Sequence, residues 1–314
     1  MTTVDRDEPQ PAAGPEQATG GSDEDTFGGG IESPRVAATK RTISYGLLSI
    51  FAVIYLGPFL LSIATSFKTS ASSTADPLNL IPNPVTLEAW KQLFGIAGRV
   101  GNIHLARWTI NSLIVTICIT VGRVGLASLA GYSLARLRFP GRKQVLGLIL
   151  AVMMVPGVVL LIPRFLILKQ LDIRNTYMGM IFPLLVDCAA IYLMKQNFEA
   201  LPISVEEAAR IDGASTFRIF RSIVLPMARP SLIAVTVLSV QGAWNEFTAF
   251  LVATDKPQFN TLTLGLAQLR GGLGSGNNYP LFLGAAVLTT IPIIVVFFTF
   301  QRYFTGDAAA GSDK

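Results

Sequence analysis

Histidine and cysteine are nearly absent from this sequence. Its 314 residues include one histidine, His104, and two cysteines, Cys118 and Cys188. A single histidine excludes an HExxH zinc site and a histidine-containing catalytic triad within the chain, and the two separated cysteines form no CxxC motif. We therefore predict no catalytic residues and no metal site, and we interpret both cysteines as packing residues.

Charged residues are also too few to cover a soluble surface. They make up 14% of the chain, against about 25% in a soluble domain, whereas hydrophobic residues make up 51%. We predict an all-α membrane protein with six transmembrane helices, because six apolar stretches are long enough to cross about 30 Å of hydrocarbon. They are Tyr45–Phe67, Trp108–Leu134, Val145–Leu168, Tyr177–Met194, Ser231–Ala253 and Pro280–Phe304.

The two terminal segments differ from this membrane domain in composition. Residues 1–44 are rich in Asp, Glu, Gly, Pro and Ala, which predicts a disordered tail, and they lack the basic start and apolar run of a signal peptide. Residues 305–314 are mostly small and predict a second flexible tail. Residues 45–304 form the predicted membrane domain.

Lysine and arginine are unevenly distributed between the loops. They concentrate on one side, beside span ends and in short loops: Arg35, Lys40, Arg41, Arg136, Arg138, Arg142, Lys143, Lys195, Arg210, Arg218, Arg221, Arg229 and Arg302. The positive-inside rule then predicts that both termini and the segment 201–226 face the cytosol. The net charge of +5 reflects this bias, and no basic patch outside the spans indicates nucleic-acid binding.

A nucleotide-binding loop is missing as well. No GxxxxGK[ST] sequence occurs, so the chain does not bind ATP through a P-loop. The glycine-rich run 271–276 follows no strand and opens no helix, and we interpret it as a flexible outer loop rather than a phosphate cradle. Any energy from ATP must come from a partner chain.

The segment 201–226 is a polar stretch between two membrane-length runs. Ser204 and Glu207 have the spacing of a capping box, Gly213 fits the left-handed position that ends a helix, and Ser215 or Thr216 can start a second helix that Pro226 closes. Glu206 and Arg210 lie four residues apart and predict a weak surface pair. The pattern predicts a helix, a glycine break and a helix.

Polar residues inside the fifth predicted span form a cluster: Gln241, Gly242, Trp244, Asn245 and Glu246. They lie about 25 Å from Arg229 in a continuous helix, at mid-depth or toward the outer leaflet. Amide, carboxylate and indole groups suit a sugar, whose hydroxyls hydrogen-bond and whose ring faces stack on aromatics. The alternative is a polar contact between helices.

Two charges lie near the middle of their spans, Arg123 in the second and Asp187 in the fourth. A charge in lipid costs at least about 2.5 kcal/mol, so matched depth predicts an ion pair between them. The alternative is an arginine that extends toward the membrane surface. Pro156-Gly157, Pro163, Pro183 and Pro292 predict bends in the third, fourth and sixth spans.

Several motifs resemble one protein family. Glu207-Ala208-Ala209, Gly213, Ile223 and Leu225-Pro226 have the spacing of the "EAA" loop of ABC-importer permeases. Further marks are Asn111-Ser112, Gly131-Tyr132-Ser133-Leu134-Ala135-Arg136, Phe139-Pro140-Gly141-Arg142, Trp244-Asn245-Glu246-Phe247 and Gln301-Arg302-Tyr303-Phe304. From about Tyr45 to Phe304 the chain is similar to permease subunits of carbohydrate-uptake ABC importers of the maltose type.

The resemblance implies a type I ABC-importer permease fold in a bacterial inner membrane. It places Glu207, Ala208, Ala209, Asp212 and Gly213 in the loop that docks on an ATPase, and it places the cluster around Trp244 beside the sugar path. It also implies partners: a second permease, two ATPases that bind ATP and magnesium, an extracytoplasmic sugar-binding protein and a di- or oligosaccharide substrate. Arg123 and Asp187 depart from the pattern, which leads us to expect apolar or small residues there.

Three alternatives remain open from the sequence. The solute could be glycerol-3-phosphate or a polyol, although phosphate recognition favours Arg or Lys in the cavity, and the spans offer few besides Arg123. A membrane-embedded enzyme would need paired acid–base groups or metal ligands facing one cavity. A passive channel would need no docking loop.

Overall fold

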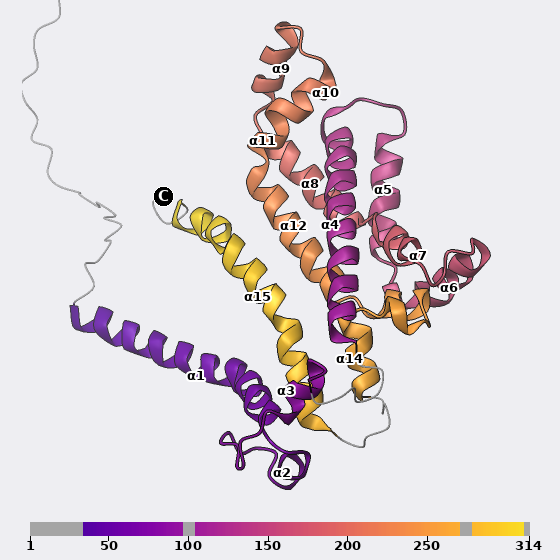
Figure 1. The fold of residues 1–314 in the computed structure, drawn as a ribbon. Helices are drawn as coiled ribbons and strands as arrows, with labels where there is room; N and C mark the ends of the chain where they lie inside the picture. The colour runs from indigo at the N-terminus through magenta and orange to yellow at the C-terminus, as the bar shows by residue number, and fades with distance from the viewer. Residues whose placement is uncertain (1–33, 97–103, 271–277, 311–314) are drawn as a thin grey trace, which may run out of the picture. The chain divides into compact units, whose positions relative to one another are not determined.

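The computed structural model describes residues 34–96, 104–270 and 278–310, and every regular element in these ranges is a helix (Figure 1). The predicted glycine-rich loop and the first 33 residues lie outside them. The helices are α1 Pro34–Ser66, α2 Ser70–Ala75, α3 Glu88–Leu93, α4 Leu105–Arg136, α5 Arg142–Met153, η1 Gly157–Leu160, α6 Leu161–Gln170, α7 Tyr177–Ile181, η2 Phe182–Leu184, α8 Cys188–Ala200, α9 Ile203–Ile211, α10 Thr216–Ile219, η3 Phe220–Val224, α11 Leu225–Met227, α12 Arg229–Trp244, α13 Thr248–Ala253, η4 Pro257–Phe259, α14 Leu262–Arg270 and α15 Tyr279–Ala310.

The chain divides into two units, Met1–Ile54 and Tyr55–Lys314, and the packing below concerns the second. Helix α1 begins at Pro34, before the boundary that we predicted at residue 44, and α15 continues to Ala310, within the predicted tail.

Three helices are long and apolar enough to cross a membrane, at Arg41–Ser66, Leu105–Arg136 and Tyr279–Gln301. Three further pairs pass the same test together but are bent, so the described residues provide up to six spans if each pair counts as one. The predicted all-α membrane fold is therefore confirmed.

Two of the three bends in the described residues lie where proline predicted them, and the third, of 80°, lies between Met227 and Arg229. The third span turns by 93° between Met153 and Gly157, at the predicted Pro156-Gly157 break. The fourth bends by 44° between Leu184 and Cys188, just after Pro183. Pro163 and Pro292, in contrast, do not interrupt α6 and α15.

The continuous fifth span that we predicted at Ser231–Ala253 is wrong. Helix α12 ends at Trp244, and α13 starts only at Thr248. The Asn245 side chain donates to Gln241 O at 2.9 Å, and the Glu246 carboxylate accepts from Ala249 N at 2.7 Å. Polar side chains that bond nearby backbone compete with helix continuation, and here they produce a turn.

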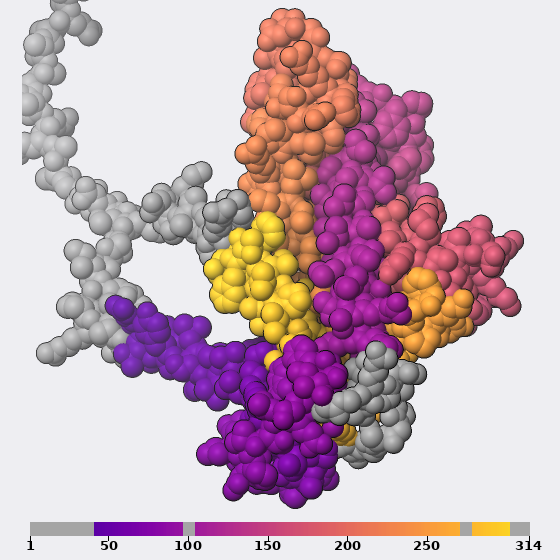
Figure 2. Space-filling view, in the orientation of Figure 1, coloured from indigo at the N-terminus to yellow at the C-terminus, as the bar shows by residue number. Residues whose placement is uncertain are grey.

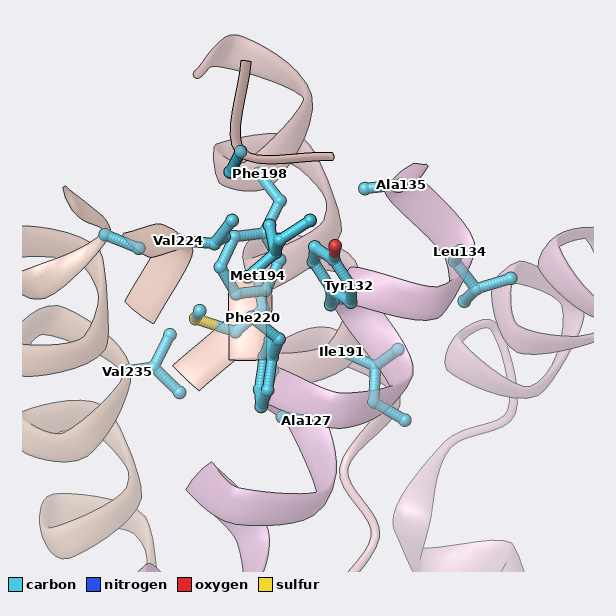
Figure 3. Packing of buried hydrophobic residues seen from close by; sticks show 14 residues of the cluster. Ala127, Tyr132, Leu134, Ala135, Ile191, Met194, Phe198, Phe220, Val224 and Val235 are labelled. Atoms are coloured by element: carbon cyan, nitrogen blue, oxygen red, sulfur yellow. The ribbon is translucent and has the colours of Figure 1, made fainter. Parts of the chain in front are cut away.

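The principal core lies between α4, α8, α10–η3 and α12. The Tyr132 ring lies 5.0 Å from that of Phe220 and 5.9 Å from that of Phe198 between centroids, with Met194 and Val224 beside them (Figure 3). Helices α4 and α8 approach closely at Gly131, where an added Cβ would lie 2.8 Å from Met194 Cβ. Small residues allow such approach between membrane helices.

The two ends of the second unit differ. Helices α9 to α11 lie at one end of α4 and α8, and they project beyond the neighbouring helices, whereas α2, α3 and α14 lie at the opposite end (Figures 1 and 2). At that opposite end, Asn111 donates to the backbone oxygens of Gln258 and Asn260, and Ser112 accepts from Leu262 N. The Asn111-Ser112 motif thus holds the segment before α14.

Candidate functional site

The segment 201–226 folds as the predicted helix, glycine break and helix. Helix α9 ends at Ile211, and Gly213 adopts the left-handed conformation at φ +78°. The amide nitrogens of Gly213 and Ala214 donate to Arg210 O and Ala209 O, which closes the helix end. Ser215 caps α10 by accepting from Arg218 N at 3.4 Å. The helix does not end at Pro226, as we had predicted, because Pro226 lies in the first turn of α11.

The capping box predicted for Ser204 and Glu207 is absent. Helix α9 starts one residue before Ser204, with Pro202 as its N-cap and no side-chain hydrogen bond to the cap. Proline at that position supplies an extended backbone and leaves no capping role for Ser204.

The predicted docking residues mostly face outward. Glu207, Ala208, Asp212 and Gly213 are exposed, and only Ala209 is buried in the core. Large apolar side chains are exposed on the same projection: Ile203, Val205, Ile211 and Phe217. This mixture of apolar and charged side chains on a projecting surface is suited to a protein partner.

Glu206, which we had paired only with Arg210, is the buried acid of this region. It is 2% exposed. Its Oε1 lies 2.8 Å from Arg136 Nε, an ion pair whose angle is not that of a hydrogen bond, and its Oε2 accepts from the Tyr132 hydroxyl at 3.1 Å. Arg210 Nη2 is farther away, at 3.9 Å. The principal partners of Glu206 therefore come from α4.

Arg136 also contacts the end of α8. Its Nη2 donates to Leu201 O at 2.6 Å, at the C-cap of α8. Since Tyr132 and Arg136 are four residues apart on α4, both side chains lie on the same face of that helix. One face of α4 thus holds both α9 and the junction that precedes it.

The ion pair that we predicted between Arg123 and Asp187 is present. Arg123 Nη1 lies 3.5 Å from Asp187 Oδ2, and Nε and Nη2 both donate to Leu184 O. Arg123 is 9% exposed, and an added Cβ on Gly242 would lie 3.7 Å from its Nη1. The guanidinium is therefore enclosed between α4, the break before α8 and α12.

The cluster predicted in the fifth span does not gather around one cavity. Gln241, Gly242 and Asn245 are exposed, whereas Trp244 is buried and its Nε1 donates to Thr289 O of α15 at 3.0 Å. Trp244 lines a cavity of about 270 Å³ between α4, α12 and α15, together with Leu113, Thr116, Ile117, Thr120, Val121, Val240, Pro292, Ile293 and Val296.

Comparison with known proteins places the chain in a family. Residues 124–307, more than half of the chain, match the model of the binding-protein-dependent transport system inner membrane component. The chain is 34% identical over 275 residues to the arabinooligosaccharides transport system permease protein AraQ of Halalkalibacterium halodurans, covering 87% of this chain and 95% of that protein.

Two further proteins are similar to this chain; one is named for a different solute, and the other is a solved structure. The sn-glycerol-3-phosphate transport system permease protein UgpE of Brucella abortus is 28% identical over 84% of this chain and 94% of its own length. A solved bacterial ABC transporter involved in the import of the acidic polysaccharide alginate superposes with a TM-score of 0.74, at 23% identity, over 87% of this chain and 99% of the other. The latter shows the fold alone.

This chain belongs to the family of inner-membrane components of binding-protein-dependent transport systems. It is a multi-pass permease subunit of an ABC importer and not an enzyme. Members of the family work with a substrate-binding protein and ATPase partners, and the fold is that of type I importer permeases.

Proposed function

We propose that this chain carries a di- or oligosaccharide across the bacterial cytoplasmic membrane together with a second permease, two ATPases and an extracytoplasmic sugar-binding protein. Its own residues bind no ATP; the ATPases would hold ATP and magnesium. Both termini and the α9–α10 projection would face the cytosol, where an ATPase can reach them.

The observation that carries the proposed coupling is the projecting helix–glycine–helix element. Glu207, Asp212 and the exposed apolar side chains of α9 give a partner both charge and apolar surface. Gly213 sets the angle between α9 and α10, because its positive φ favours glycine. The element is therefore built as a docking surface for an ATPase.

The docking role is tested in the assembled transporter with Glu207→Lys and Gly213→Val. Both variants should retain membrane insertion and lose co-purifying ATPase and uptake. Glu88→Lys, an exposed charge reversal on α3 at the opposite end, is the matched control for the first. Gly213→Asn is the control for the second, because asparagine tolerates the left-handed conformation better than valine. Normal uptake in both Glu207→Lys and Gly213→Val would refute the docking role.

A neutral sugar fits the chain better than a phosphate. The relative with the higher reported identity is an arabinooligosaccharide permease. Gln241 and Asn245 expose amide groups, which suit sugar hydroxyls. Arg123 is occupied by Leu184 O and Asp187, so it offers no free guanidinium to a phosphate.

Glycerol-3-phosphate is the second candidate, because UgpE is 28% identical to this chain. The two are separated by reconstituting the complex with its binding protein and measuring stimulated ATP hydrolysis. Stimulation by neutral oligosaccharides supports the proposal, whereas stimulation by glycerol-3-phosphate alone overturns it.

A further inference from the structure

Helix α4 holds both ends of α8 through two arginines. Arg123 and Arg136 are about 20 Å apart along α4 at 1.5 Å per residue. Helix α8 has 13 residues and is therefore also about 20 Å long. The two side chains meet the backbone just before α8 and just after it, so their spacing matches the length of the helix that they hold.

At the first end, Arg123 and Asp187 complement the two helix termini that face each other at the break in the fourth span. Arg123 binds Leu184 O at the end of η2, with Nε at 3.1 Å and Nη2 at 2.9 Å. Asp187 Oδ1 accepts from Ala190 N at 3.0 Å and caps α8. A cation at a helix C-terminus and an anion at an N-terminus are both favourable, so the ion pair stabilises the bent form of the span.

At the second end, Arg136 holds the junction between α8 and α9. It binds Leu201 O at the end of α8 and pairs with Glu206 in the first turn of α9. The Tyr132 hydroxyl donates to the same carboxylate. The buried acid therefore fixes α9 to α4 and, through the shared arginine, to the end of α8.

Between these ends α4 and α8 approach each other closely at Gly131. An added Cβ on Gly131 would lie 2.8 Å from Met194 Cβ and 2.9 Å from Lys195 N. Interdigitated surfaces of this kind shift between discrete arrangements and do not deform continuously. The pair is thus held at both ends and in the middle.

We propose that α4 and α8 form one rigid lever, and that Glu206 is the positioning residue that fixes the coupling helix α9 to it, so that displacement of α9 is transmitted to the break at residues 185–187. The proposal rests on the docking role of α9 given above. It assigns the two adjacent glutamates different tasks: exposed Glu207 meets the partner, and buried Glu206 transmits the partner's movement.

A direct contact between Glu206 and an ATPase is the competing explanation. The side chain is 2% exposed and lies against Tyr132 and Arg136. A partner on the surface of α9 reaches Glu207 before it reaches Glu206, so the geometry favours transmission.

The test compares Glu206→Gln with Glu207→Gln in the complete transporter reconstituted in vesicles. We expect Glu206→Gln to retain its ATPases and to transport about tenfold less sugar per ATP hydrolysed, because the neutral amide loses the charged contact with Arg136. Glu207→Gln should show the reverse pattern, with less bound ATPase and an unchanged ratio in the complexes that remain. If Glu206→Gln lost its ATPases as Glu207→Gln does, or matched the unmodified chain in both measurements, the proposal would be overturned.

A distance measurement tests the rigid lever itself. Spin labels on Gln196→Cys in α8 and Ser204→Cys in α9, in a chain whose Cys118 and Cys188 are replaced by serine, report the separation of the two helices. That distance should be the same with and without ATP when Glu206 is present and should depend on ATP in Glu206→Gln. An ATP-dependent distance in the unmodified pair would contradict the lever.

Two further controls keep the outcomes separable. If Glu206→Gln does not assemble, Tyr132→Phe removes one hydroxyl from the same carboxylate and should lower the transport ratio in the same direction by less; an unchanged ratio there would count against the proposal. If Glu207→Gln and Glu207→Lys both retain their ATPases and uptake, the docking role of α9 fails independently of Glu206.

Discussion

Polar side chains serve opposite purposes in the α9 anchor, formed by Tyr132, Arg136 and Glu206, and in the turn at residues 245–247. In the anchor they join elements that are far apart in the sequence, since α4 contacts both α9 and Leu201 O. In the turn, Asn245 and Glu246 bond backbone groups three or four residues away. Polar side chains thus build tertiary structure in one region and end a helix in the other.

The difference teaches where a substitution should act. A change in the anchor should alter how α4, α8 and α9 move together, because its contacts are shared between helices. A change in the turn should stay local and leave the bundle intact, because Gln241 and Asn245 are exposed. A change in the anchor should therefore affect stability strongly, whereas a change in the turn should affect stability little and act, if at all, on transport.

The largest effect should come from Gly131→Leu, which lies beside the anchor. Its side chain would meet Met194 and the backbone nitrogen of Lys195, and backbone cannot move aside. We expect a loss of about 3 kcal/mol or more, the upper part of the range for overpacking, measured as the thermal unfolding of the purified complex. Gly125→Leu on the same helix is the control, since nothing lies within 4 Å of its added Cβ. Equal stability of the two variants would show that α4 and α8 are not tightly held.

The next effect should come from the Arg123–Asp187 pair. Asp187→Asn retains an N-cap residue but removes the charge, so among the described residues Arg123 keeps only Leu184 O as a partner. We expect a loss of about 2 kcal/mol, less than for a fully buried pair, because the Asp187 side chain is 33% exposed.

A double-mutant cycle with Arg123→Met gives the coupling between the two charges. It should measure about 1–2 kcal/mol in unfolding experiments on the complex. Additive single effects would mean that the two charges act independently. The ion pair would then not be a second case, beside the anchor, in which polar side chains join distant elements.

These contrasts also explain how much could be predicted from the sequence. Three features were predictable: the bend at Pro156-Gly157, the glycine break at Gly213 and the Arg123–Asp187 pair. The first two depend on local backbone preferences of proline and glycine, and the third depends only on the depth of each charge in its span. Glu206 was not, because helical spacing offers Arg210 as its partner, whereas its short contacts come from Tyr132 and Arg136 on α4.

The end of α12 was unpredictable for a different reason. The residues after the turn, Thr248–Ala253, are apolar again, so a hydropathy window continues through Asn245 and Glu246. Only the backbone hydrogen bonds of these two side chains show that the helix stops. Composition over a long window cannot detect such a local competition.

A smaller effect should come from Trp244→Phe, which tests a side chain next to the turn that contacts another helix. The variant loses the hydrogen bond to Thr289 O, for which we expect about 1 kcal/mol. Trp108→Phe is a matched control, because Trp108 is also buried but its Nε1 has no hydrogen-bond partner among the described residues. The difference between the two losses of unfolding free energy isolates the contribution of the hydrogen bond. Equal losses would mean that this bond does not stabilise the contact between the turn region and α15.

The smallest effect on stability, and the one that most sharpens the comparison, should come from Asn245→Ala. Its side chain is exposed and, among the described residues, hydrogen-bonds only Gln241 O of α12, so we expect a change of about 0.5 kcal/mol or less. If the exposed amides meet the sugar, Asn245→Ala and Gln241→Ala should nevertheless raise the KM for uptake several-fold, whereas Leu238→Ala, exposed on the same helix, should not. An unchanged KM in both amide variants would remove the turn from the substrate path, because a side chain with so little structural role would then have no transport role either.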